Sequence, residues 1–363
     1  MSERSEPSLT QLVEQAEIVV CCGSGGVGKT TTAAVIALEA ARRGRRAAVV
    51  TIDPAKRLAN AMGLADLANT PTEVPGDWPG ELWALMLDTK STFDGLVSKH
   101  AADNAQAERI LANRFYQNIS GALSGTQEYM AAEKLYELRH DFDFDLVVVD
   151  TPPTRAALDF IDAPRRLSRF LDHRLYRLFM APTRGFVRAV NVAAQTLVRT
   201  ISKVVGAEVF DDAITFFSAF EGMEQGFKQR AVAVEALLKD ADTAFVLVAS
   251  PRADTVAEAT YFADKLAESG IGVRALVVNR VHPRFGDGLP EAAAERAAGL
   301  TGTPLGDLDA NLADLDALAA VEAGHLVDLA ERVAPAPVVR VPMLAGDVHD
   351  LAGLALIAVH LVP

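Results

Sequence analysis

The 363-residue sequence predicts an α/β protein with a doubly wound, mostly parallel sheet and an inserted α-helical subdomain. Three observations support this fold class. Short apolar runs alternate with helix-favouring stretches along the chain. Most of these runs are uninterrupted, which is typical of strands buried on both faces of a parallel sheet. A glycine-rich loop directly follows the first run.

The expected strands lie near residues 17–22, 45–52, 81–87, 144–149, 243–249, 272–279 and 337–342. The Ala-rich stretch from Thr31 to Arg43 predicts a helix after the glycine-rich loop, and Gly44 is placed to end it. Residues Pro71 to Pro79 are expected to form a loop. The last residues, Leu351 to Pro363, are mostly apolar and are expected to join the core.

Two insertions, residues 89–141 and 155–239, are predicted to be helical and to form a subdomain within a single domain of residues 1–363. The segment from Phe186 onwards carries two stripes at helical spacing. The polar stripe comprises Arg188, Asn191, Gln195, Arg199 and Ser202, and the apolar stripe comprises Phe186, Val190, Ala193, Leu197, Ile201 and Val204. A second apolar stripe comprises Phe216, Phe220, Met223 and Phe227.

The second insertion begins with a strongly basic segment. Residues 155–205 contain ten Lys or Arg and three Asp or Glu, a net charge of +7 in a protein whose net charge is −13. Such a basic, apolar helical region is a candidate contact for an anionic membrane surface, a client helix or an acidic subunit. The alternative is an amphipathic helix that packs on the core and leaves a solvated basic face.

Composition excludes several classes of function. The net charge of −13 argues against general nucleic-acid binding, which needs basic surface. The two cysteines, Cys21 and Cys22, are neighbours in a predicted strand and point to opposite faces, so we expect buried, reduced thiols. The polar residues 1–17 are no signal peptide, and no apolar run has the roughly 18 residues that a membrane span requires. We therefore expect a cytoplasmic protein, with peripheral membrane association left open.

Residues Gly23 to Thr31 read G-S-G-G-V-G-K-T-T and satisfy the phosphate-binding pattern G-x-x-x-x-G-K-[ST]. Backbone N–H groups of such a loop, together with the following helix N-terminus, hold phosphate oxygens. Lys29 is expected to reach the β- and γ-phosphates of ATP, and the Thr30 hydroxyl to bind Mg²⁺. The predicted nucleotide-binding residues here are Gly23, Ser24, Gly25, Gly26, Val27, Gly28, Lys29, Thr30 and Thr31. The alternative is a glycine-rich turn that binds nothing.

Polar residues also follow other strands of the predicted sheet. Asp53, Asp150 and Asn279 each follow or finish an apolar run, at the sheet edge where a nucleotide is expected. Asp150 ends the run Leu146 to Val149 and is predicted to hold Mg²⁺ through water. A buried or capping aspartate is the alternative. Asn279 can offer both a donor and an acceptor, and a strand-end turn is its alternative role.

The doubled glycine and doubled threonine resemble the deviant P-loop ATPases, which include the ParA/MinD, nitrogenase iron-protein and arsenite-pump (ArsA) groups. Further segments resemble the ArsA group, which includes the ATPase that guides tail-anchored membrane proteins. Thr51 to Ala55 and Asp150 to Thr154 resemble its two switches, and Val341 to Asp347 resembles its adenine loop. Val277 to Asn279 resembles the strand whose Asn reads the adenine edge. The likeness is greatest to actinobacterial ArsA-like ATPases that work as unequal pairs.

This resemblance implies particular roles. Asp53 corresponds to the carboxylate that orients the attacking water, so Asp53 and Lys29 are the predicted catalytic residues. A helix N-cap is the alternative role of Asp53, and the two roles can coexist. Asn279 is implied to contact adenine, and Pro342 to press on its ring.

Ser24 stands where the family has a lysine that reaches across a dimer to the partner's phosphates. Serine has neither the charge nor the reach, so this chain is not expected to complete the site of an identical partner. A heterodimer with a lysine-bearing paralogue would have one complete site, which would be the site of this chain. The departure therefore favours an unequal pair.

Other positions also depart from the family pattern. Lys56 and Arg57 replace a histidine and a small polar residue in the first switch, and Arg155 and Ala156 replace Gly-His in the second. These extra cations could substitute in part for the missing lysine, or face solvent. No C-x-x-C pair is present, so a zinc-clasped dimer is unsupported, and arsenite-binding cysteines are absent as well.

Three functions remain open from the sequence. The first is a Mg²⁺-dependent ATPase subunit that couples ATP hydrolysis to a helical region facing a client or a membrane. The second is a regulatory subunit in which bound ATP only stabilises the assembly, which Ser24 favours. The third is a MinD/ParA-like positioning ATPase, which the switch sequences and the adenine loop disfavour.

Overall fold

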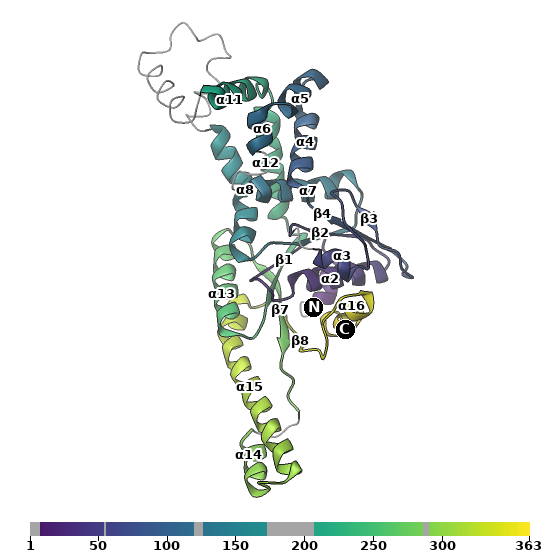
Figure 1. Ribbon diagram of the computed structural model, residues 1–363, viewed down its shortest axis with the longest axis vertical. Helices are drawn as coiled ribbons and strands as arrows, with labels where there is room; N and C mark the ends of the chain where they lie inside the picture. Colours follow the sequence, from purple (N-terminus) through teal and green to yellow (C-terminus); the bar gives the residue numbers. More distant parts are fainter. Residues whose placement is uncertain (1–7, 54–55, 120–125, 173–206, 286–289) are drawn as a thin grey trace, which may run out of the picture. The chain divides into compact units, whose positions relative to one another are not determined.

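The computed structural model describes residues 8–53, 56–119, 126–172, 207–285 and 290–363 (Figure 1). The chain divides into two compact units. Unit 1 comprises Met1–Met86, Phe142–Leu158 and Ala241–Pro363, and unit 2 comprises Leu87–Asp141 and Asp159–Asp240.

Unit 1 is built on an eight-stranded sheet in the order β3-β4-β2-β5-β1-β6-β7-β8. The strands are β1 (Ile18–Gly23), β2 (Arg46–Thr51), β3 (Thr72–Glu73), β4 (Glu81–Met86), β5 (Leu146–Asp150), β6 (Thr243–Ala249), β7 (Val273–Val281) and β8 (Val338–Pro342). All neighbouring pairs are parallel except β3 with β4. The predicted doubly wound, mostly parallel α/β fold is confirmed.

The central strands are buried along their whole length. Every residue of β1, β5 and β6 is buried, because helices cover both faces of the sheet. All seven expected strands are present. The loop predicted for Pro71 to Pro79 is wrong at Thr72–Glu73, which pairs antiparallel with β4 at the sheet edge. Two residues are too few to show any periodicity in the sequence.

The two cysteines are free and buried in β1, as predicted. Cys21 packs in the core cluster formed with α2 (Lys29–Arg42), whereas its neighbour Cys22 points to the opposite face. Burial raises the pKa of the Cys22 thiol to about 12. Both thiols are therefore protonated and unreactive at neutral pH.

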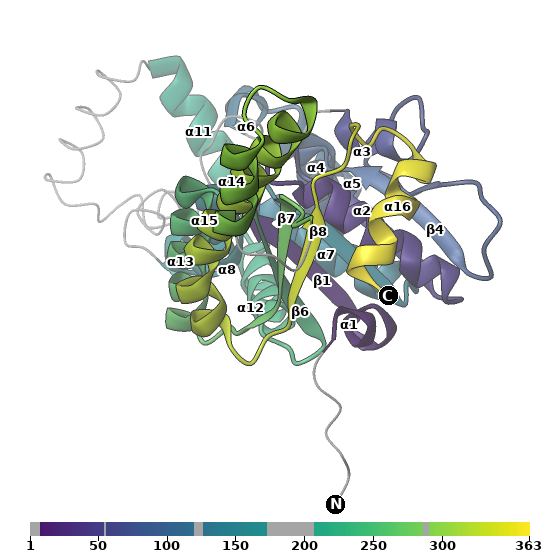
Figure 2. The same ribbon diagram turned by 90° about the horizontal axis from the view of Figure 1, so that it is seen from below.

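Two helical layers enclose the sheet (Figure 2). One layer comprises α1 (Leu9–Gln15), α2 and α16 (Leu351–Leu361), which share a core cluster with alternate strand residues. The other contains α13 (Ala253–Glu268) and α15 (Pro304–Val333), and α14 (Pro290–Gly299) packs along α15. Short α3 (Arg57–Ala61) follows β2. The C-terminal segment joins the core through Leu354, Ile357, Ala358 and Leu361, as expected.

Unit 2 is helical throughout the residues that the structure describes. Its helices are α4 (Thr89–His100), α5 (Asn104–Leu111), α6 (Arg114–Ile119), α7 (Thr126–Asp141), α11 (Ala207–Ala219) and α12 (Glu224–Leu238), with most of α8 (Thr154–Asp172). Its core is aromatic and includes the predicted stripe of Phe216, Phe220, Met223 and Phe227. The stripes predicted from Phe186 onwards lie outside the described residues. No helix in the described ranges is both long and apolar enough to cross a membrane.

Candidate nucleotide-binding site

The glycine-rich loop connects the end of β1 to the start of α2. Gly23 lies against β6, where an added Cβ would sit 2.0 Å from the Val248 carbonyl oxygen. Gly28 has φ +100°, a left-handed conformation, and an added Cβ would lie 2.2 Å from Nδ2 of Asn279. Both positions therefore require glycine. Helix α2 begins immediately after Gly28, so its first N–H groups point into the loop.

Lys29 is the first residue of α2 and is only 7 % exposed. Its Nζ donates a hydrogen bond to the backbone oxygen of Ser24, at 2.7 Å across the loop. Burial lowers the pKa of the Lys29 ammonium, while the nearby Asp150 carboxylate opposes this shift. The ammonium group is thus held over the loop where phosphate oxygens would bind.

Ser24 is buried at 4 % exposure. Its hydroxyl is one of the buried side-chain oxygens that have no hydrogen-bond partner among the described residues. An unpartnered buried hydroxyl is costly, and it is a feature of sites where a ligand supplies the partner. Ser24 carries no positive charge, and its backbone oxygen already accepts the Lys29 bond.

Asp150 ends β5, between β1 and β2, and is 1 % exposed. Its Oδ2 accepts hydrogen bonds from the hydroxyls of Thr30, at 2.7 Å, and Thr51, at 2.9 Å. Burial raises the pKa of Asp150, and the two hydroxyls and Lys29 oppose that shift. Hydroxyl and carboxylate oxygens are ligands that suit Mg²⁺. The predicted Mg²⁺ residues, Thr30 and Asp150, are therefore in direct contact.

The segment after β2 forms another wall of the site. The backbone N–H of Asp53 donates to Oγ1 of Thr51 at 3.2 Å, which fixes the start of this segment. Asp53 and Arg57 line the cavity described below. Lys56 instead pairs with Asp66 at 3.5 Å, and both side chains are more than 60 % exposed. The two cations of the first switch are thus separated, and the side chains of Arg155 and Ala156 lie outside the described residues.

Asn279 near the end of β7 holds the loop from the opposite side. Its Nδ2 donates to the Val27 carbonyl at 2.9 Å, and its Oδ1 accepts from the N–H of Arg280 at 2.9 Å. Arg280 has φ +64°, and the pairing of β7 with β8 shifts register here, as at a β-bulge. Asn279 lines the cavity as well. Its bond to the next residue is not the strand-end turn of its alternative role, because β7 continues to Val281. Pro342, which ends β8, lines it too.

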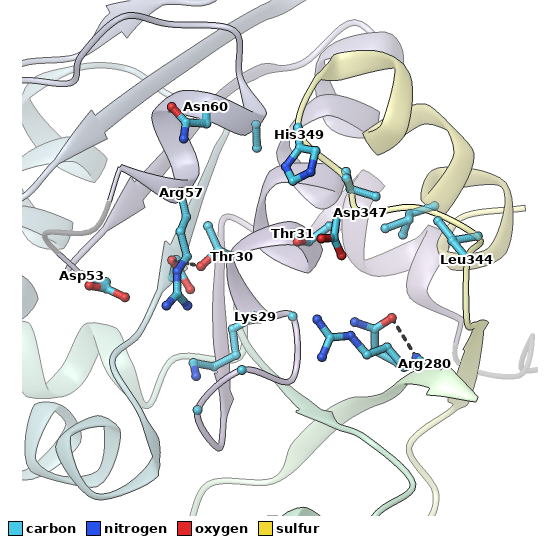
Figure 3. Close-up of a pocket in the computed structure, with 18 of the residues that line it drawn as sticks. Lys29, Thr30, Thr31, Asp53, Arg57, Asn60, Arg280, Leu344, Asp347 and His349 are labelled. Carbon is cyan, nitrogen blue, oxygen red and sulfur yellow. Dashed lines mark hydrogen bonds between the residues drawn. The ribbon is translucent and has the colours of Figure 1, made fainter. Parts of the chain in front are cut away.

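These elements enclose a cavity of about 780 Å³, within the size range of ligand pockets (Figure 3). The predicted site residues that line it are Gly25, Gly26, Gly28, Lys29, Thr30, Thr31, Asp53, Asp150, Asn279 and Pro342. Gly23, Ser24 and Val27 do not line it. Lining residues that sequence reasoning missed include Asn60, Arg280, Asp347 and His349. Asp347 is the last residue of the expected adenine loop, Val341 to Asp347.

Comparison with known proteins identifies relatives of this chain. The family described as "Anion-transporting ATPase" matches residues 16–294. The chain is 29% identical to the ATPase asna-1 of Caenorhabditis elegans, over 47% of this chain and 52% of that protein. It is 25% identical to the ATPase GET3 of Malassezia globosa, over 77% and 78%. It is 28% identical to the arsenical pump-driving ATPase of Acidiphilium multivorum, over 76% of this chain but 40% of that protein.

Proposed function

The chain belongs to the anion-transporting ATPase family, a group of nucleotide-binding ATPases, and from this premise we propose that it is a Mg²⁺-dependent ATP-hydrolysing subunit of a dimer. The contact of the Thr30 hydroxyl with Asp150, beside the buried Lys29 ammonium, carries the proposal. Phosphoryl transfer needs positioned phosphates, a metal ion, an oriented water and compensation of developing charge. Residues that line the cavity are suited to the first three needs, and a partner lysine is proposed to contribute to the fourth.

Each role follows from the chemistry of the side chain. The loop N–H groups and Lys29 bind the phosphates, and Thr30 with Asp150 binds Mg²⁺. A Mg²⁺ ion held by these two residues would neutralise part of the charge on the phosphate oxygens. Asp53 lies on the separate wall after β2, from which its carboxylate can orient the attacking water. Asn279 and Pro342 lie at the ends of neighbouring strands, suited to contact adenine.

The partner in this proposal is a lysine-bearing paralogue. Ser24 cannot deliver positive charge to the phosphates of a partner, so two copies of this chain would both lack that contribution. A paralogue that carries lysine at this position would complete the site of this chain. The basic segment 155–205 is the proposed contact for a client helix or an anionic membrane surface, and we propose a cytoplasmic location for the assembly. Neither zinc nor nucleic acid has a role in it.

Hydrolysis by the purified chain tests the proposal when it is measured beside Asp53→Asn and Ser24→Lys variants. We expect low turnover by the unaltered chain, a further loss of about 10²-fold or more in Asp53→Asn, and a gain in Ser24→Lys, whose dimer supplies the missing charge. Asp66→Asn is the matched control, because Asp66 is exposed and lies outside the cavity. Oligomer mass is recorded for each variant.

Full turnover by the chain alone, without any gain in Ser24→Lys, would contradict the need for a lysine-bearing partner. The second candidate function is a regulatory subunit with little turnover of its own, which Ser24 also favours. It predicts ATP binding without turnover in every assembly, including complexes with a paralogue.

A further inference from the structure

Helix α3 lines the cavity with two polar side chains and with Ala61. Leu58, Ala59 and Ala61 are buried and anchor this short helix to the core. Arg57 and Asn60 are exposed, lie three residues apart on one face, and both line the cavity. Figure 3 shows the Arg57 side chain extending from α3 towards Thr30, on the side of the cavity where Asp53 lies.

Arg57 differs from its neighbour Lys56 in what it contacts. The Lys56 ammonium is paired with Asp66 and does not line the cavity. In the described part of the chain, the Arg57 guanidinium has no hydrogen-bond or ion-pair partner, although it is a strong donor that is always charged. A fork of N–H donors that faces a cavity and is committed to no carboxylate is suited to bind an anion.

The balance of charge in this part of the cavity favours contact between an anionic ligand and Arg57. Asp53 and Asp150 contribute two carboxylates, and the cations beside them are Lys29 and Arg57. Lys29 is committed to the loop, through its bond to the Ser24 carbonyl. A triphosphate brings more negative charge than Lys29 and a bound Mg²⁺ would balance beside these two carboxylates. Arg280 also lines the cavity, next to Asn279, whereas Arg57 extends towards Thr30 (Figure 3).

We propose that Arg57 binds the terminal phosphate of the nucleotide from within the same chain, and so makes the site prefer a triphosphate to a diphosphate. This inference rests on the proposed function, because it takes ATP as the ligand. Arginine matches phosphate oxygens with two parallel N–H donors, which a lysine cannot do. The contact is made in cis, and a lysine from a partner would add to it.

Calorimetric binding to the full chain tests this inference, with Mg²⁺ and either a non-hydrolysable ATP analogue or ADP. Arg57→Gln should weaken binding of the analogue by about tenfold, equal to about 1.4 kcal/mol, and change ADP binding by less than about threefold, or 0.7 kcal/mol. Arg57→Lys should lie between the two, because it keeps the charge and loses the fork. Lys56→Gln is the matched control and should change neither affinity.

Equal weakening of both nucleotides by Arg57→Gln would overturn the inference, because it would indicate a general effect on the site. Unchanged binding of both would overturn it as well. Thermal unfolding of each variant shows whether the fold is retained, and Arg57 is exposed, so no loss of stability is expected. Failure of the unaltered chain to bind either nucleotide would instead contradict the proposed function, and this inference with it.

Discussion

Two walls of the cavity are built in opposite ways. The phosphate-loop wall, residues 23–31 with Thr51 and Asp150, holds its charged groups in the interior, where Lys29 and Asp150 are 7 % and 1 % exposed. The switch wall, residues 53–60 as far as they are described, presents its cations on the surface. Burial lowers the pKa of Lys29 and raises the pKa of Asp150, which favours the neutral form of each.

The two walls differ in how much the charges that bind the ligand reduce the stability of the fold. Burial disfavours the charged forms of the groups in the phosphate-loop wall. Removing such a charge should therefore abolish ligand binding without weakening the fold. The cations of the switch wall are exposed, so their removal should leave the stability of the fold unchanged, and only removal of Arg57, which lines the cavity, should affect the ligand.

The largest effect is expected for Lys29→Met, which removes the buried charge and keeps most of the side-chain volume. Loss of a buried, charge-assisted contact costs about 2–5 kcal/mol, so ATP affinity should fall by roughly 30-fold to more than 1,000-fold. The thermal midpoint of the nucleotide-free protein should stay the same or rise, because burial disfavours the ammonium. Calorimetry and thermal unfolding measure the two effects, and a clear loss of stability would contradict the comparison.

Asp150→Asn should give the second effect. Asparagine can still accept bonds from Thr30 and Thr51 through its amide oxygen, but it carries no charge for Mg²⁺. Hydrolysis should lose its dependence on Mg²⁺ and fall to background. The nucleotide-free protein should be more stable, with a Tm about 2–4 °C higher for each kcal/mol of relieved burial cost.

The pH dependence of that gain follows from the direction of the pKa shift. The folded-state pKa of Asp150 is raised, so the folded protein binds the proton more tightly than the unfolded chain does. The cost of the ionised group is absent below the ordinary pKa of aspartate and is complete above the raised value. The difference in Tm between Asp150→Asn and the unaltered chain should therefore grow as the pH rises through that window. A difference that shrank with rising pH would refute the assignment.

The residues at the strand ends could be predicted from the sequence, whereas the orientation of the switch-wall side chains could not. The seven main strands could be predicted because each is a short apolar run, most of them uninterrupted, and Asp53, Asp150 and Asn279 could be identified because they follow or finish such runs. The strand β3 could not be predicted, since its two residues pair only through the tertiary fold. The sequence also does not decide which of Lys56 and Arg57 faces the cavity. The answer depends on the pairing of Lys56 with Asp66, ten residues later.

Other cavity residues lack any pattern of their own. Arg280 lines the site at a register shift between β7 and β8, and His349 lines it from the segment between β8 and α16. Their positions follow strand ends, as a doubly wound sheet predicts. Their side-chain types show no spacing that sequence reasoning could use, and only the arrangement of the strands brings them together.

The smallest effect sharpens the comparison inside the phosphate-loop wall, where Gly26 and Gly28 share a left-handed backbone but not the same surroundings. An added Cβ at Gly26 meets nothing within 4 Å, whereas at Gly28 it meets Nδ2 of Asn279. Each alanine should cost about 1–2 kcal/mol through its positive φ. Gly28→Ala should cost about 1 kcal/mol more, because the Asn279 bond to the Val27 carbonyl must break.

Denaturant unfolding of both glycine variants, alone and combined with Asn279→Ala, measures that difference as a double-mutant cycle. In the Asn279→Ala background, the Val27 bond is already absent and the obstructing amide is gone, so the two alanines should cost the same. Equal costs in that background would show that the excess cost of Gly28→Ala arises from its contact with the Asn279 amide. If the excess persists without the Asn279 amide, the Gly28 backbone itself is more strained than that of Gly26, and the contact with β7 does not explain why this position requires glycine.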